Sequence, residues 1–256
     1  MRSSDEGKKK NIGTAVISIV LFAFTASVAG AADHYNLEEG IPTRIEDAIA
    51  TGLYNREVQG VFRWDHTDEG DAKFLLEPRI EAGIFRNLEA ELTVPFNLGP
   101  GAEDEGIGDV KLGALYNFNQ ETLVLPMFAL SAAVNFPTSD EGEGYDTTVK
   151  AIMTKTIGPG SLLQRLHLNI IWDHNDDAEE DERDDHFTYI LGYDRRISPD
   201  MIWIVDLLRE EEKMKGKDSN ILESGIRYML NPLTVVAAGI GAGLGDDSPE
   251  FRATFG

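Results

Sequence analysis

The most regular feature of the sequence is a strict alternation of apolar and polar residues in short stretches. Residues 88–96 place an apolar side chain at every second position, and residues 110–118 repeat the pattern. A period of two is typical of a β-strand with one apolar face. The acidic, glycine-rich residues 99–106 lie between the two stretches. This region therefore predicts a β-hairpin, and each arm has about the ten residues that a tilted transmembrane strand needs.

The same alternation recurs along most of the chain and predicts twelve strands. They cover residues 57–65, 73–85, 88–96, 110–118, 122–136, 147–157, 162–172, 186–197, 201–209, 220–230, 233–244 and 249–255. Pro126 falls inside one of them, and a strand ladder accepts proline only at an edge, an end or a bulge.

The connections between these strands alternate in length. Short turns lie near Asn87, Asn119, Gly158, Pro199 and Pro232, and longer hydrophilic loops lie near Asp68, Gly101, Gly142, Glu180, Lys215 and Asp246. Outer-membrane barrels have short periplasmic turns, long external loops and an even number of strands. The pattern predicts an all-β, 12-stranded antiparallel transmembrane β-barrel of this type, with acidic external loops.

Alternation alone does not determine whether the apolar face of the strands points into the barrel or outward. In a soluble barrel that face would form the core, and the charged side chains would be solvated outside at no cost. However, about eight strands already enclose a filled interior, so twelve leave more space than side chains fill. An outward apolar face in lipid, with a closed sheet and a wet lumen, satisfies every backbone group. We therefore predict that apolar residues face lipid, with aromatic girdles at Trp64, Phe85, Phe96, Phe118, Phe136, Trp172, Tyr193, Tyr228 and Phe255.

The amino terminus has the features of a secretory signal peptide. Three lysines precede the apolar residues 12–26, and Ala29, Gly30 and Ala31 supply the small residues of a cleavage site. The alternative is a retained anchor, because residues 12–32 are almost long enough to span a bilayer. Cleavage is favoured because small residues followed by Asp33 suit processing. The predicted organisation is a signal peptide (1–31), a periplasmic lead-in (32–56) that either hangs free or enters the lumen, and a barrel (57–256).

Composition narrows the possible functions. The chain has a formal charge of -22 and no cysteine. Residues 1–31 contain four basic and two acidic residues, and subtracting this +2 leaves -24 for the remainder. Such acidity argues against nucleic acid as a partner, because phosphate is bound by patches of Lys and Arg. Without cysteine, no disulfide framework holds this exported chain together.

Several segments together resemble one family of bacterial outer-membrane proteins, that of the MetA pathway of phenol degradation. They are residues 41–65, Glu-Pro-Arg at 77–79, Val-Pro-Phe at 94–96, Gly-Ile-Gly-Asp-Val at 106–110, Asn-Phe-Pro-Thr at 135–138, Leu-His-Leu-Asn at 166–169 and Gly-Asp-Asp-Ser-Pro at 245–249. The resemblance implies a β-barrel in the outer membrane that passes small, aromatic or other hydrophobic molecules. It brings no catalytic residues with it.

The polar face of the predicted strands carries opposed charges that would line the lumen. The candidates are Arg63, Glu77, Arg79, Glu81, Glu89, Glu91, Asp109, Lys111, Lys150, Arg165, His167, Asp194, Arg196, Asp206, Glu223, Arg227 and Arg252. In one interpretation neighbouring strands pair these charges into a polar filling of the barrel. In the other they form a constriction that selects solutes by charge and size, as charged rings do in pores.

One external loop resembles a calcium-binding loop in its spacing of oxygen ligands. Its candidate ligands are Asp173, Asn175, Asp177, Glu179, Asp181 and Asp184. Ala178 stands where such loops have a glycine, and the segment joins strands rather than helices. A solvated acidic loop is therefore the simpler interpretation. Of the two specific roles, Ca²⁺ or Mg²⁺ ions that loosely bridge this loop to lipopolysaccharide phosphates are favoured over a folded calcium site.

We found no sequence pattern that indicates an enzyme. Ser131 and His167 could face the lumen, but no Gly-x-Ser-x-Gly element is present. His174 and His186 neighbour acidic residues, which a hydrophilic loop explains equally well. We predict a channel or transporter for small molecules, with membrane lipid and lipopolysaccharide around it and no resident cofactor. The alternative is a structural or surface-interaction barrel with a closed lumen.

Overall fold

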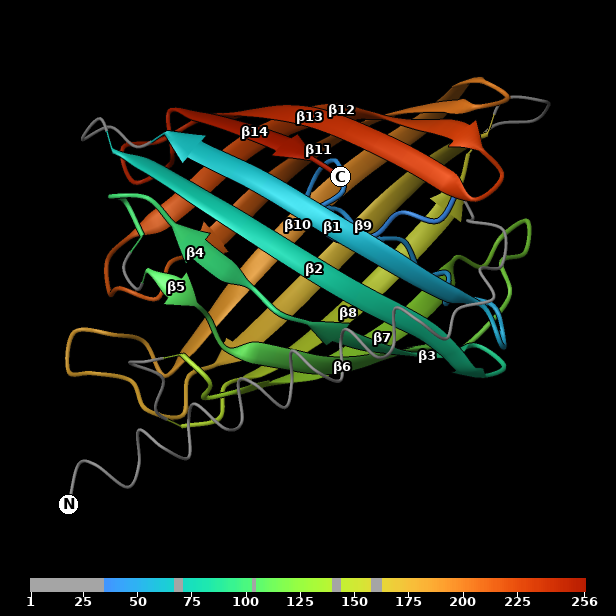
Figure 1. The fold of residues 1–256 in the computed structure, drawn as a ribbon. Coiled ribbons are helices and arrows are strands. Elements are labelled where there is room, and N and C mark those ends of the chain that lie inside the picture. The colour runs from blue at the N-terminus through green and yellow to red at the C-terminus, as the bar shows by residue number, and fades with distance from the viewer. Residues whose placement is uncertain (1–34, 67–70, 103–104, 140–143, 158–162) are drawn as a thin grey trace.

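The computed structural model describes residues 35–66, 71–102, 105–139, 144–157 and 163–256, and these form a closed antiparallel β-barrel (Figure 1). The predicted signal peptide and the turn near Gly158 lie outside the described residues. Within the described part of the chain, no helix is long and apolar enough to cross a membrane.

Fourteen strand segments form the wall. They are β1 (Arg56–His66), β2 (Ala72–Phe85), β3 (Leu88–Thr93), β4 (Phe96–Leu98), β5 (Gly106–Ile107), β6 (Val110–Asn117), β7 (Met127–Phe136), β8 (Thr147–Thr156), β9 (Gln164–His174), β10 (Asp185–Ser198), β11 (Met201–Glu211), β12 (Asp218–Asn231), β13 (Thr234–Gly243) and β14 (Phe251–Phe255).

These segments make twelve spanning strands. β3 and β4 are one strand interrupted at Val94 and Pro95, and β5 and β6 are one strand interrupted at Gly108 and Asp109. β2 accordingly pairs with both β3 and β4, while β1 pairs with β2 and β14 and closes the ring. The predicted 12-stranded antiparallel transmembrane barrel is confirmed.

Two proline residues shift the predicted strand boundaries. The predicted strand 122–136 begins only at Met127 in the structure, after Pro126. Residues 122–126 instead form a turn, in which the Thr122 N–H donates to the Leu125 carbonyl at 3.0 Å. Pro95 likewise interrupts the predicted strand 88–96, because proline has no N–H to give to a ladder. Alternation alone could not show these breaks, since it continues through both prolines.

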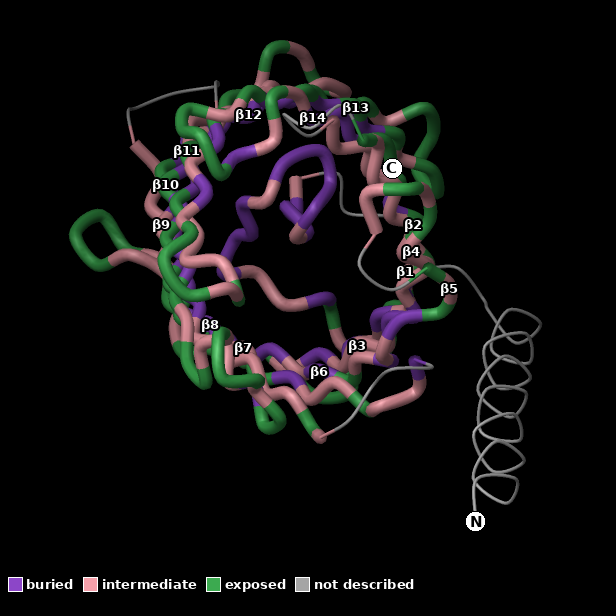
Figure 2. The backbone as a smooth tube through the Cα atoms, turned by 90° about the vertical axis from the view of Figure 1, so that its left-hand side faces the viewer, coloured by how far each residue is buried: buried purple, intermediate pink, exposed green. Residues whose placement is uncertain are grey.

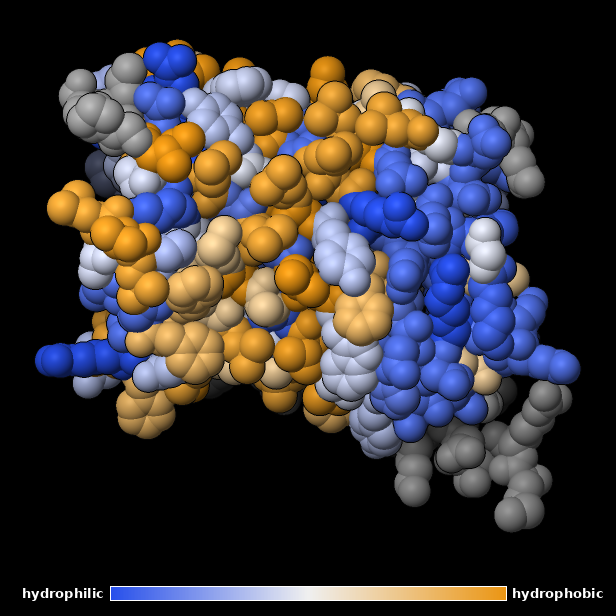
Figure 3. Space-filling view, turned by 180° about the vertical axis from the view of Figure 1, so that it is seen from behind, coloured by the Kyte–Doolittle hydropathy of each residue, from blue (hydrophilic) through white to orange (hydrophobic). Residues whose placement is uncertain are grey.

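The outward face of the barrel is apolar, and the inward face carries most of the charged side chains of the wall together with one apolar cluster. Leu191 on β10 is 57% exposed and Leu222 on β12 is 47% exposed, whereas their inward neighbours Ile190 and Glu223 are buried. Figure 3 shows an apolar band across the middle of the molecule, with hydrophilic residues gathered toward its ends. Exposing such side chains to water would cost roughly 1.5–3 kcal/mol for each one, so lipid is their medium. This confirms the predicted orientation.

Residues 35–51, which we call the plug, lie inside the barrel (Figures 1 and 2), and residues 52–55 connect the plug to β1 at the end of the barrel. Leu37 and Ile45 of the plug are buried in an apolar cluster with inward side chains of the wall, which are Ile171, Ile190, Ile202, Ile204, Leu208 and Ile221. Of the two placements that the sequence left open for the lead-in, the structure therefore has the one inside the lumen.

Glycines in the wall leave room for the plug. A Cβ atom added to Gly192 on β10 would lie 2.5 Å from Cγ1 of Ile45. One added to Gly225 on β12 would lie 2.6 Å from Cγ of Pro42. These separations are shorter than carbon atoms tolerate, because attractive contact lies near 3.5–4.0 Å. The wall is thus shaped to the plug, and only a residue without a side chain fits at these positions.

Candidate functional site

Side chains of the wall bind the backbone of the plug. The N–H groups of Arg44, Ile45 and Thr51 donate to the carboxylates of Glu223 (2.9 Å), Asp206 (2.8 Å) and Glu89 (2.6 Å), respectively. The N–H groups of Glu46 and Ala48 donate to Asn169 and Thr154 in the same way. The plug has little secondary structure to satisfy its own backbone, so the wall supplies the partners that buried N–H groups require.

A buried arginine joins the plug to two strands. The Arg165 guanidinium on β9 donates to Asp47 of the plug at 2.7 Å and to Asp194 on β10 at 2.6 Å. Arg165, Asp47 and Asp194 are all buried. The planar guanidinium binds both carboxylates at once, which is the geometry that makes such charge-assisted hydrogen bonds strong. Because each charge is desolvated, removal of Arg165 would leave two buried carboxylates without the cation that pairs them.

A second group of charges surrounds Glu39 of the plug. Lys150 on β8 donates to Glu39 at 2.6 Å and also to Glu46. Lys111 on β6 and Arg44 lie farther away, each with its nearest nitrogen 3.7 Å from a Glu39 oxygen. Glu39 is therefore a carboxylate shared by three cations, of which only Lys150 makes a direct hydrogen bond to it.

All of the charged residues predicted to line the lumen are buried or half-buried on the inward face. Those that bind the plug are Arg79, Glu89, Lys111, Lys150, Arg165, Arg196, Asp206, Glu223 and Arg227. Within the described part of the chain, the others do not bind the plug directly. They pair with charged or polar groups of the wall, lie beside the plug or border the cavities described below. These residues are Arg63, Glu77, Glu81, Glu91, Asp109, His167, Asp194 and Arg252.

Between the plug and one side of the wall lies a polar cavity of about 340 Å³. It is lined by Glu39, Arg44, Glu77, Thr93, Pro95, Asn97, Gly108, Asp109, Lys111, Asn135, Thr148, Ile171 and Asp173. The wall residues among these lie toward the ends of the strands that carry the long hydrophilic loops. We call this cavity the vestibule, and its position is on the external side of the plug.

Below the vestibule the space narrows to a neck of about 10 Å³, enough for water alone. The charged residues of the neck are Glu39, Glu46, Glu89, Glu91, Lys111 and Lys150. Glu39 and Lys111 border both spaces, so they stand where one leads into the other. The plug therefore leaves two adjacent polar cavities, of which the smaller lies along β3, β6, β7 and β8.

The acidic loop that resembles a calcium site is organised mainly around Glu182. The Asn175 side chain and the Glu179 N–H both donate to this carboxylate, at 3.1 and 3.2 Å. Desolvation opposes ionisation, but the hydrogen bond from Glu179 and the nearby Lys213 ammonium outweigh it and lower the pKa of Glu182. Asp173, by contrast, lies in β9 and accepts a hydrogen bond from Thr148. Metal binding by this loop stays a prediction.

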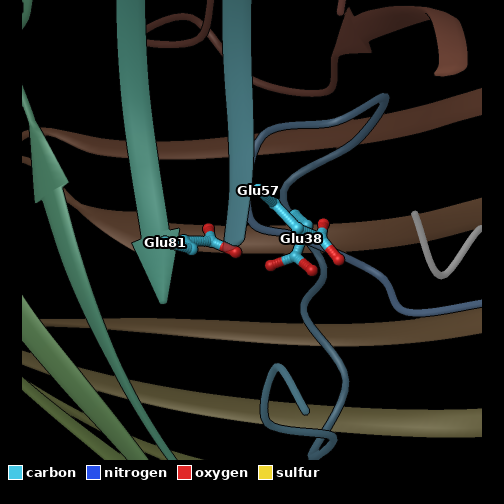
Figure 4. Close-up of side chains that lie close together, drawn as sticks. All are labelled: Glu38, Glu57 and Glu81. Atoms are coloured by element: carbon cyan, nitrogen blue, oxygen red, sulfur yellow. The ribbon is translucent and has the colours of Figure 1, made fainter. Parts of the chain in front are cut away.

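Oxygen ligands converge elsewhere, at Glu38, Glu57 and Glu81 (Figure 4). One oxygen from each lies within 4.8 Å of the other two. Among the described residues this is the group of acidic and histidine side chains that comes close enough to hold a metal ion. Glu57 and Glu81 are paired across β1 and β2, as the alternation implies. Glu38 belongs to the plug, so the sequence pattern could not bring it to them.

The residues considered for catalysis have other partners. Nδ1 of His167 lies 3.0 Å from the Thr154 hydroxyl, and Ser131 on β7 borders the neck. His174 lies 3.0 Å from Asp185, and His186 lies 3.9 Å from Asp173. These contacts hold the rim and interior of the barrel together.

Sequence reasoning missed the charged residues of the plug itself, namely Glu38, Glu39, Arg44, Glu46 and Asp47. Their segment has no period of two, and each acts through a partner far away in the sequence. The one available signal was the density of charge in a short segment that also carries Leu37, Ile41 and Ile45. Such a mixture suits a segment that contacts both apolar and charged side chains.

Comparison with known proteins agrees with this architecture. Residues 50–256 match the model of the family described as "Putative MetA-pathway of phenol degradation". The chain belongs to this family. A similar solved structure is the crystal structure of an outer membrane channel from Pseudomonas putida F1, with a TM-score of 0.63 and 14% sequence identity. The match covers 82% of this chain and 96% of that one. No curated protein sequence matches.

Proposed function

We propose that this protein is an outer-membrane channel through which small solutes pass between the plug and the wall. The observation that carries the proposal is the pair of adjacent polar cavities, the vestibule and the charged neck, which together would form a passage beside the plug. A closed barrel with an apolar outer face spans a membrane, and the structurally similar protein from Pseudomonas putida F1 is an outer membrane channel. Export would follow from the signal peptide, with lipid and lipopolysaccharide around the barrel.

The lining of the vestibule bears on the kind of solute. The family description concerns phenol degradation, which suggests an aromatic or otherwise hydrophobic solute. Of the thirteen residues that line the vestibule, six are charged and none is aromatic. Burying apolar surface against such groups would desolvate them without new hydrogen bonds. An aromatic solute that used this passage would therefore carry polar or ionised substituents.

A closed, structural barrel is the second candidate. It is favoured by the small volume of the neck and by the hydrogen bonds that hold the plug in place. In this function the barrel would display its acidic loops, which would bind divalent cations or partners outside the cell. The two functions differ in whether ions and solutes cross the lumen.

Planar-bilayer recordings of the purified chain without its signal peptide test the channel. We expect discrete openings of small conductance, because only a narrow passage remains beside the plug. A variant that lacks residues 33–49 should open to a clearly larger conductance. Heat-modifiable gel mobility of both proteins controls for folding. If both folded proteins stay silent at high protein load, the channel is wrong and the closed barrel stands.

A further inference from the structure

Two cations in the vestibule have unused capacity to donate hydrogen bonds. The nearest carboxylate oxygens to the Arg44 guanidinium belong to Glu39 and Glu210, each at 3.7 Å. Nζ of Lys111 is likewise 3.7 Å from both Glu39 and Glu91. Direct hydrogen bonds between charged groups are about 2.7–2.9 Å long, so these contacts are ion pairs with room between the groups. Lys150, by comparison, is held directly by Glu39 at 2.6 Å.

Acidic side chains lie on the external side of these cations. Lys111 on β6 is paired with Thr93 on β3, and Thr93 is paired with Arg79 on β2. Glu77 and Asp109 are each two residues nearer the external loops on their own strands, and both border the vestibule. Asp173 borders it as well, close to the external end of β9. The external part of the vestibule is therefore acidic, with Asp109 and Asp173, and Lys111 lies deeper on the strand of Asp109, beside the carboxylate of Glu39.

This order of charges discriminates between kinds of solute. An acidic entrance attracts cations and repels anions, and the acidic chain as a whole strengthens this effect. A simple cation gains nothing further at the level of Arg44 and Lys111. A simple anion must first pass Asp109 and Asp173. A solute with an ammonium group and a carboxylate can match both levels at once.

We propose that the vestibule is a binding site for small zwitterions of the amino-acid type, with the carboxylate between Arg44 and Lys111 and the ammonium group toward the acidic entrance. This proposal rests on the proposed channel function and names its substrate class. Its volume of about 340 Å³ is near the lower end of ligand pockets, which range over about 300–1,000 Å³, and suits a single small molecule. The neutral side chains Thr93, Asn97 and Asn135 offer further hydrogen bonds.

Tracer flux into proteoliposomes containing the chain without its signal peptide tests the proposal. The probes are L-alanine, its neutral analogue lactamide, its anionic analogue lactate and the cation 1-amino-2-propanol, which are similar in size. We expect alanine to enter fastest and to saturate. Lys111→Met should lower alanine flux about tenfold, since one charge-assisted hydrogen bond is lost, and should change lactamide flux less than about twofold. Lys111→Arg should restore alanine flux.

Lys217→Met is the matched control, because it removes one positive charge from an exposed loop outside the vestibule. It should leave the ratio of alanine to lactamide flux unchanged. Equal entry of alanine and lactamide, with both affected equally by Lys111→Met, would overturn the zwitterion site and leave the channel standing. Fastest entry of lactate or of the amine would also overturn it. If none of the four probes enters, the channel itself fails.

Discussion

At the scale of single residues, Arg165 shows how the interior is stabilised. It is buried between Asp47 and Asp194, to which it donates at 2.7 and 2.6 Å, whereas the His167 ring lies farther from Asp194, at 3.5 Å. We expect Arg165→Met to lower the free energy of unfolding by about 3–5 kcal/mol, because two buried carboxylates lose their partner. Urea unfolding in detergent measures this. Arg86→Met, in an exposed turn, is the control, and an equal effect of both variants would contradict the argument.

Glu121, in the turn between β6 and β7, provides a pH-dependent contact. It accepts hydrogen bonds from Lys155 Nζ (2.7 Å), the Thr156 N–H (2.8 Å) and the Thr156 hydroxyl (2.7 Å). Desolvation acts in the other direction, but these bonds prevail and lower the pKa of Glu121. An acid with a lowered pKa contributes stability above its unfolded pKa, and this stability is lost as the pH falls through the folded value.

We therefore expect the unfolding midpoint to fall on acidification below about pH 4.5, partly through Glu121. In Glu121→Gln this part of the dependence should be absent, so the wild type and the variant should converge at low pH and differ at neutral pH. Unfolding curves at a series of pH values measure the difference. A constant difference between the two proteins at every pH would show that Glu121 acts by shape rather than by charge.

At the scale of elements, the fit between plug and wall determines how wide the passage is. A side chain at position 192 would collide with Ile45, which supplies the three heavy atoms nearest to a Cβ placed there. We expect Gly192→Val to displace the plug, at a cost of about 1–3 kcal/mol, and to raise single-channel conductance. Gly60→Val is the control, because a Cβ there meets nothing within 4 Å. Unchanged conductance in a folded Gly192→Val protein would show that the plug tolerates the collision.

The elements also show where sequence patterns are sufficient. The number, order and facing of the spanning strands follow from a period of two, which depends on neighbouring residues alone. The interruptions at Pro95 and before Met127 follow from proline chemistry, although the alternation continues through them. The two-residue segment β5 pairs only with β4. The pairing of β5 with β4 depends on how the two interrupted strands pack against each other. No pattern within one segment of the sequence could therefore have predicted it.

At the scale of the whole molecule, the distribution of polarity is inverted relative to a soluble protein. Large apolar side chains cover the outside, including Leu112 at 51%, Leu191 at 57% and Ile240 at 62% exposure. We expect the chain without its leader to be folded and monodisperse only when detergent or lipid is present, because these surfaces otherwise associate. Size-exclusion chromatography with circular dichroism measures this. A folded, monodisperse protein in plain buffer would contradict the membrane-spanning assignment.

The sequence by itself determined the barrel, its strand number and the polarity of its two faces, because each depends on alternation between adjacent residues. It also determined which charged residues of the wall face inward. Only the tertiary structure placed residues 35–51 in the lumen and so created the vestibule and the neck. The reason is physical: the plug has no periodicity of its own, and partners distant in the chain hold it, such as Asp47 with Arg165 and Arg44 with Glu223.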